Sequence, residues 1–117
     1  MNQLPSPIDF SDLLEMLGGD KQIVASLLSK FVDELTTDLA ASELSITHQD
    51  AEALRQIAHR IKGTSANLHA LMLSAAAHEL EQACTEADAS LMKIKQRVMS
   101  DQARTVREAI ESWGAEN

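Results

Sequence analysis

The stretch that decides the fold lies in the middle of the chain, where residues 51–68 read AEALRQIAHRIKGTSANL. Its apolar residues recur with helical spacing, at Leu54, Ile57, Ala58, Ile61 and Leu68. At about 100° per residue these side chains gather on one side of an α-helix and leave the opposite side to the rest. The spacing therefore predicts an amphipathic helix that opens with a capping box of Thr47 and Asp50 and stops near Asn67.

Helical spacing also marks the segments on both sides of this helix. A short helix is expected to start at Ser6-Pro7 and to stop at Gly18-Gly19. Asp20 then caps a longer helix. The apolar stripe of that helix is Val24, Leu27, Leu28, Phe31, Leu35 and Leu39. A fourth helix carries Leu73, Ala76, Ala77, Leu80, Cys84 and Ala87 on one face. Asp88 or Ser90 caps a fifth helix. The expected stripe of the fifth helix is Leu91, Ile94, Val98, Thr105, Ala109 and Trp113.

The composition points to the same fold class. The chain has 117 residues, of which 44% are hydrophobic and only 3% aromatic, and it has no tyrosine. Strands favour aromatic and β-branched residues, whereas Ala, Leu, Glu, Gln and Met are good helix formers. We therefore expect an all-α domain, an antiparallel four-helix bundle with a short additional N-terminal helix. The expected domain spans residues 8–113, between flexible termini at 1–7 and 114–117.

The composition argues against several function classes. The formal net charge of −8 argues against nucleic acid, because phosphate binding needs clustered Lys and Arg. No run approaches the length of a membrane helix, and no basic, cleavable leader follows Met1. The single cysteine, Cys84, falls on an apolar stripe and is expected to be a buried core thiol. These features lead us to expect a cytoplasmic monomer with no membrane contact.

One glycine interrupts the central helix. Glycine in a helix interior costs about 1 kcal/mol relative to alanine, so Gly63 calls for a reason. A close crossing of two helices is the ordinary reason. By the same angular count, however, Gly63 lies opposite the apolar stripe, on the exposed side. A glycine in that place leaves room for something outside the domain to approach.

The neighbours of Gly63 on this side suggest chemistry. His59 lies one turn earlier, Lys62 is three residues after His59, and the small residue Ala66 lies on the next turn. An imidazole is a nucleophile near neutral pH, and an ammonium one turn away can stabilise a transferring phosphoryl group. His59, Lys62, Gly63 and Ala66 are therefore the candidate site. The competing interpretation is an ordinary solvated histidine on a purely structural bundle.

The charge distribution gives a second signal. The chain has 18 acidic residues, yet none falls between Ala53 and His78, a window that contains Arg55, Arg60 and Lys62. A locally positive strip would steer an acidic partner towards the imidazole. Arg55 and Arg60 are for this reason candidate partner-binding residues.

Other kinds of site find no support in the sequence. No histidine has a second histidine three or four residues away, and no Glu-x-x-His pair occurs, so neither metal pattern is present. The letters Lys62-Gly63-Thr64-Ser65 have the wrong order for a phosphate-binding loop and lack its upstream glycine. We expect no metal site and no cofactor.

Residues 58–68, AHRIKGTSANL, closely resemble the core motif of histidine-containing phosphotransfer (HPt) domains. That motif reads His-x-x-Lys-Gly, then small residues, then a helix that opens with a leucine and contains Leu-Glu, as Leu73 and Leu80-Glu81 do here. The resemblance covers about residues 8–113, including Gly18-Gly19-Asp20 and Phe31.

The resemblance implies a phosphorelay function. His59 would accept a phosphoryl group from the aspartate of a receiver domain and pass it to another receiver. Lys62 would help neutralise the phosphoryl oxygens, and Gly63 would leave room for the receiver. The implied partners are response-regulator receivers and a hybrid sensor histidine kinase, with magnesium on the receiver. The chain has no ATP-binding segment, so it would be a phosphoryl carrier without ATP-dependent kinase activity.

Two questions stay open at this point. The family usually has a glycine ten residues after the phosphorylated histidine, where this chain has His69, a residue type that tolerates positive φ better than most. The chain could also be a helical adaptor, or pseudo-HPt protein, that binds a receiver without carrying phosphate. For docking of a phosphotransfer domain to receivers, apolar contacts from residues of the first helix such as Leu13 or Leu14 are expected to add to the positive strip.

Overall fold

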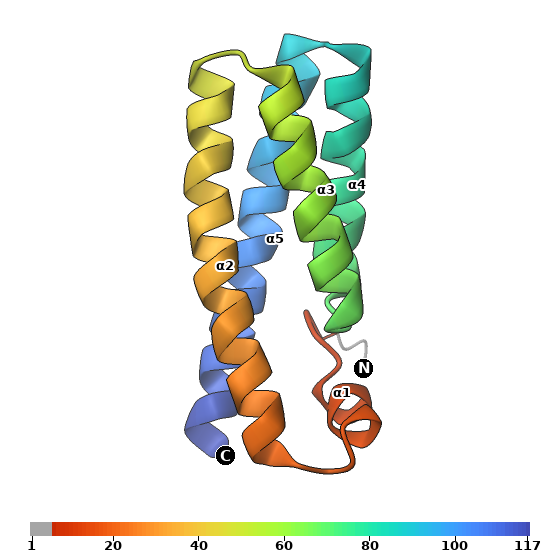
Figure 1. Ribbon diagram of the computed structural model, residues 1–117, viewed down its shortest axis with the longest axis vertical. Coiled ribbons are helices and arrows are strands. Elements are labelled where there is room, and N and C mark those ends of the chain that lie inside the picture. The colour runs from red at the N-terminus through yellow and green to blue at the C-terminus, as the bar shows by residue number, and fades with distance from the viewer. Residues whose placement is uncertain (1–5) are drawn as a thin grey trace, which may run out of the picture.

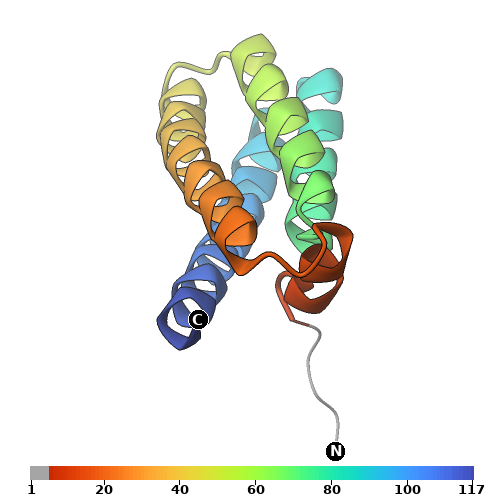
Figure 2. The same cartoon turned by 60° about the horizontal axis from the view of Figure 1, so that its bottom comes forward.

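The computed structural model describes residues 6–117, and all its regular structure is helical. The helices are α1 (Phe10–Met16), α2 (Lys21–Thr47), α3 (Ala51–Asn67), α4 (Leu71–Glu86) and α5 (Ala89–Glu116). The four long helices stand side by side, and each runs opposite to the one before it (Figure 1). α1 lies across the end of the bundle where α3 stops and α4 starts (Figures 1 and 2). The predicted all-α class is confirmed.

Aspartates start four of the five helices. The side chains of Asp20, Asp50 and Asp88 accept hydrogen bonds from backbone N–H groups in the first turns of α2, α3 and α5. Two predicted starts are wrong. Asp9, not Ser6-Pro7, caps α1, since its carboxylate accepts from the N–H of Asp12. Thr47 ends α2 instead of opening α3, and its hydroxyl donates to the carbonyl of Glu43.

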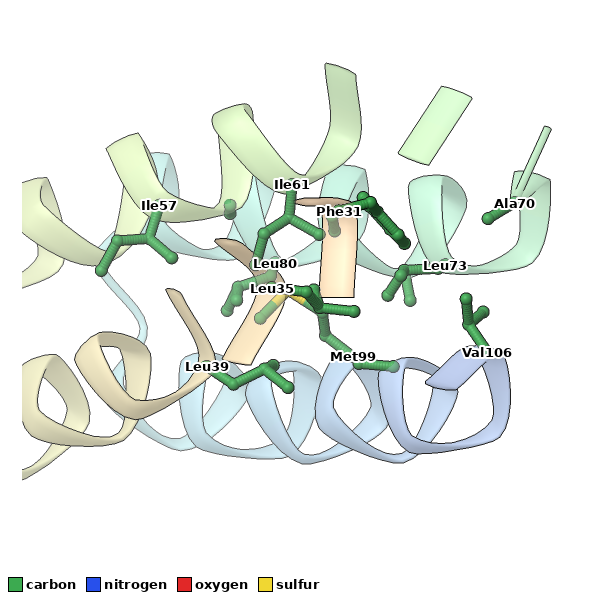
Figure 3. Close-up of a cluster of buried hydrophobic side chains, with 14 of the residues drawn as sticks. Phe31, Leu35, Leu39, Ile57, Ile61, Ala70, Leu73, Leu80, Met99 and Val106 are labelled. Atoms are coloured by element: carbon green, nitrogen blue, oxygen red, sulfur yellow. The ribbon is translucent and has the colours of Figure 1, made fainter. Parts of the chain in front are cut away.

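The core fills the space between the four long helices. Its side chains come from every helix, and Figure 3 shows a central part of it. The labelled side chains are Phe31, Leu35, Leu39, Ile57, Ile61, Ala70, Leu73, Leu80, Met99 and Val106. Cys84 is buried as predicted, and burial raises the pKa of its thiol to about 11.

The predicted apolar stripe of the last helix is wrong at three of its six positions: Leu91, Ala109 and Trp113 pack against the core, but Ile94, Val98 and Thr105 are exposed. Ile94 is 58% exposed and Val98 is 40% exposed, while α5 buries a different set. The buried residues are Met92, Gln96, Met99, Ala103, Val106 and Ile110. The sequence pattern does not reveal this buried face, because Gln96 interrupts its apolar residues and glutamine is rarely buried. Its amide is accommodated by donating a hydrogen bond to the hydroxyl of buried Ser42, at 3.2 Å.

The turn between α3 and α4 fastens α1 to the bundle. His69 adopts φ +61°, in the left-handed region where the family's usual glycine fits without strain. Its carbonyl accepts the N–H of Asp9, and Nδ1 of its ring lies 2.8 Å from the carboxylate of Asp12. Phe10 stacks on Trp113 of α5, with ring centroids 5.6 Å apart. These contacts hold α1 against the α3–α4 turn on one side and against α5 on the other.

The chain ends differ from the predicted boundaries in one respect. α5 continues through Gly114 to Glu116, past residue 113. The amide of Asn117 donates to the carbonyl of Trp113 and extends the hydrogen bonding of that last turn. In the N-terminal segment 1–7, residues 1–5 lie outside the described part of the chain. No described helix combines the length and apolar character needed to cross a membrane.

A buried serine on α3 leads to a stability prediction. The hydroxyl of Ser65 is fully buried and has no hydrogen-bond partner among residues 6–117. An unpaired buried hydroxyl carries an uncompensated desolvation cost, and alanine is the better helix former. We expect Ser65→Ala to raise the free energy of unfolding by about 1 kcal/mol, measured by urea denaturation.

The matched control is Ser74→Ala on α4. The hydroxyl of Ser74 donates to the carbonyl of Lys62 at 2.9 Å, so its removal should lower the free energy of unfolding by about 1 kcal/mol. A loss of stability in Ser65→Ala would contradict our account of the unpaired hydroxyl.

Candidate functional site

The candidate histidine lies on α3 beside α4, and the two helices are held in register at this point. The Ser74 hydroxyl of α4 bonds the backbone of α3 at Lys62. His59, one turn before Gly63, is 65% exposed at its side chain. The imidazole is therefore on a rigid helix and open to solvent.

Glu81 of α4 contacts both candidate catalytic side chains, His59 and Lys62. Its side chain is only 16% exposed. One oxygen, Oε2, lies 2.8 Å from Nδ1 of His59, and the other, Oε1, lies 2.7 Å from Nζ of Lys62. Each half of the carboxylate thus has its own partner on α3.

This arrangement determines which ring nitrogen of His59 can react. An ionised carboxylate only accepts hydrogen bonds, so Nδ1 of His59 carries the proton that it donates to Glu81. In a neutral imidazole the other nitrogen, Nε2, then has a free lone pair. The exposed ring presents this lone pair as a nucleophile.

Glu81 stays ionised over a wide pH range. The hydrogen bond from Lys62 is the largest cause that lowers the pKa of this carboxyl, and the hydrogen bond from His59 lowers it further against the opposing effect of burial. The carboxylate consequently keeps its charge, and with it both hydrogen bonds, below the pH at which an ordinary glutamate is protonated.

Gly63 and Ala66 leave the surface beside His59 flat. Both residues are exposed. A Cβ atom added at Gly63 would have no neighbour within 4 Å, so close packing inside the domain does not require a glycine there. The structure thus agrees with the predicted exposure of Gly63.

The positive strip predicted from the acid-free window is wrong as a surface property. Each of its cations binds an acid from outside the window: Arg55 binds Glu52 at 2.7 Å, Arg60 binds Asp38 of α2 at 2.7 Å, and Lys62 binds Glu81. The bonds from Arg55 and Gln56 lower the pKa of Glu52 to about 2. The fold therefore brings distant acids next to Arg60 and Lys62, while Arg55 pairs with an acid on its own helix.

The expected docking contact from α1 also needs correction. Leu13 is fully buried in the core and Leu14 is half-buried. Leu13 is buried because α1 needs an apolar anchor to cover the bundle end, so it cannot contact a partner. The exposed apolar side chains at the start of α2 are Ile23 and Leu27.

Residue patterns alone assign no function to Glu81, although Leu80-Glu81 is part of the motif that the chain shares with HPt domains. Its contribution depends on α4 lying against α3, which residue spacing within one helix does not reveal. His78, one turn before Glu81, lies 3.9 Å from the same carboxylate. Within the described residues 6–117, no group of three or more His, Cys, Asp or Glu side chains is placed to hold a metal ion.

The comparisons with known proteins agree with this picture. The model of the Hpt domain family matches residues 26–115. A crystal structure of histidine-containing phosphotransfer protein B (HptB) from Pseudomonas aeruginosa PAO1 has the same fold, with a TM-score of 0.87 and 23% sequence identity over 98% of this chain and 99% of that one. A comparison with curated proteins gives no match.

The site thus combines an exposed imidazole, a carboxylate that contacts it and an adjacent ammonium on a helical bundle. The chain belongs to the Hpt domain family. Members of this family work with receiver domains in two-component phosphorelays, and this gives the chain a phosphotransfer function.

Proposed function

We propose that this Hpt domain accepts a phosphoryl group on Nε2 of His59 from the aspartyl phosphate of a receiver domain and passes it to the aspartate of another receiver. The observation that carries the proposal is the 2.8 Å contact between Nδ1 of His59 and Glu81. It leaves the lone pair on the outward nitrogen of an exposed ring, within reach of a partner protein.

The transfer step follows from this geometry. The Nε2 lone pair attacks phosphorus, the P–O bond to the aspartate breaks, and the aspartate leaves as a carboxylate. The proton stays on Nδ1, so the phosphorylated ring becomes cationic, and the Glu81 carboxylate stabilises that charge through the same hydrogen bond. The reverse step delivers the phosphoryl group to the next receiver.

Lys62 supplies the second electrostatic contribution. Before transfer its ammonium is held by Glu81, one turn from the phosphoryl acceptor, and it can leave this carboxylate for a more strongly charged acceptor. It can therefore donate to the phosphoryl oxygens as their charge develops. No cofactor of the domain itself takes part in the proposed step, and magnesium belongs to the receiver.

The proposed docking face surrounds His59 on α3. Gly63 and Ala66 supply a flat surface, and Arg55 and Arg60 lie at its edges, where they can exchange their internal acids for acids of the receiver. The proposal includes a hybrid sensor kinase as the source of phosphate. It also includes a monomeric, antiparallel four-helix bundle domain over residues 8–113 in the cytoplasm, where the single buried cysteine fits a reducing compartment.

A transfer assay tests the proposal. The protein is incubated with a receiver domain that carries radiolabelled aspartyl phosphate, and the label on each protein is followed after electrophoresis. We expect the label to move to this chain in an acid-labile, base-stable form. Tight binding to receivers without any transfer of label would favour the alternative, an adaptor or pseudo-HPt protein.

Substitution of Gly63 tests the docking face. Gly63→Glu places bulk and negative charge where the receiver approaches, and like charges across an interface are costly. Because nothing lies within 4 Å of the added Cβ, the variant should stay folded while transfer slows by about tenfold or more.

Gly63→Ala is the matched control. Removal of a glycine from a helix interior should raise the free energy of unfolding by about 0.5–1 kcal/mol, and a methyl group adds no charge at the interface. Transfer by Gly63→Glu at the wild-type rate would remove our explanation of this glycine.

A further inference from the structure

We propose that His78 is a positioning residue of the same reaction, one that replaces Lys62 as the hydrogen-bond donor to Glu81 when the phosphoryl group occupies His59. This inference rests on the proposed function of His59. It assigns a function to a side chain that the transfer step itself does not use.

The geometry around one oxygen atom carries the proposal. Oε1 of Glu81 accepts from Nζ of Lys62 at 2.7 Å, and Nδ1 of His78 lies 3.9 Å from this same oxygen. His78 lies one turn before Glu81 on α4, so a small rotation of its side chain closes the gap. The imidazole is 52% exposed and makes no hydrogen bond within the described part of the chain, and nothing there holds it away from Glu81.

When a phosphoryl group occupies His59, Glu81 needs a hydrogen-bond donor other than Lys62. It brings close to two negative charges beside Lys62, and the ammonium is drawn to the phosphoryl oxygens more strongly than to one carboxylate. Glu81 is only 16% exposed, so water replaces a lost donor incompletely. A charged oxygen left without a donor in such a place is costly.

Other charged groups around α4 already have partners in this structure. On α3, His59 already uses Oε2, and Arg55 is bound to Glu52 in a bidentate pair. From α5, Lys95 binds Glu79 at 3.2 Å. His78 is the neighbour of Glu81 whose side chain is uncommitted. A neutral imidazole with its proton on Nδ1 suffices as the donor.

The expected effect is on the phosphorylated state alone. Without phosphate, His78 is beyond hydrogen-bond distance of Oε1, so its replacement should leave the melting temperature and the orientation of His59 unchanged. With phosphate, loss of the substitute donor should destabilise phosphohistidine relative to the aspartyl phosphate of the receiver.

Two variants separate a positioning function from a structural one. His78→Leu removes the donor, whereas His78→Asn places an amide N–H near the position of Nδ1. Each variant is brought to equilibrium with a labelled receiver, and the ratio of label on the two proteins is measured. We expect His78→Leu to lower the share on this chain by about three- to tenfold, and His78→Asn to stay within about twofold of the wild type.

The outcomes distinguish this inference from the proposed function. A wild-type ratio in His78→Leu, or an equal loss in both variants, would overturn the inference while transfer to His59 stands. Absence of label on the wild-type protein, or label that persists in His59→Gln, would overturn the proposed function and the inference with it.

Discussion

His59→Gln is expected to reduce phosphoryl acceptance from a receiver to the background of the assay, a loss of about a thousandfold or more. The amide of glutamine has no lone pair of comparable nucleophilicity, so no bond to phosphorus forms. The side chain is 65% exposed and its one hydrogen bond is to Glu81, so the fold should not change. The measurement is the labelling rate, with far-ultraviolet circular dichroism as the check on helicity.

The matched control for this variant is His48→Gln. His48 is exposed at the C-terminal end of α2 and is not part of the proposed docking face, so its replacement should leave the labelling rate unchanged. Label that persists in His59→Gln would show that another residue accepts the phosphoryl group.

Glu81→Ala is expected to give the second largest effect. The ring of His59 loses the acceptor that fixes its proton on Nδ1, and the cationic product loses its counter-charge. Misplacement of a reacting group of this kind costs up to about a hundredfold, so we expect the labelling rate to fall by about 10- to 100-fold. Glu81→Gln should lose less, because the amide oxygen still accepts from Nδ1 although it carries no charge.

Glu79→Gln is the control for the carboxylate. Glu79 lies two residues earlier on α4 but binds Lys95 of α5, away from His59. Its replacement should leave transfer unchanged and alter stability little, since an exposed ion pair contributes about 0–1 kcal/mol. If Glu81→Ala labelled as fast as Glu79→Gln, the orienting function of Glu81 would be excluded.

The sequence predicts the helices better than the faces they bury. Aspartates at Asp20 and Asp88 and the stop at Gly18-Gly19 act within one turn of the chain, so local residue patterns suffice to find them. The face of α5 depends on a contact between Gln96 and Ser42 on another helix. A polar residue with a distant partner is invisible to apolar periodicity.

The sequence likewise predicts only the part of the candidate site that lies on a single helix. His59, Lys62, Gly63 and Ala66 share one exposed side of one helix, which angular counting can establish. Glu81 comes from the neighbouring helix. Partners on other helices also determine the surface charge, because Arg60 pairs with Asp38, which is 22 residues away in the sequence.

The central claim is that the phosphoryl group bonds to Nε2 of His59 while Nδ1 keeps its proton. The most direct measurement is nuclear magnetic resonance of the ¹⁵N-labelled protein after phosphorylation by a receiver, because the coupling between ³¹P and ¹⁵N identifies the bonded nitrogen. We predict coupling to Nε2 of His59 and a proton on Nδ1 in the same ring. A phosphoryl group on Nδ1 of His59, or on His48, His69 or His78, would contradict the account.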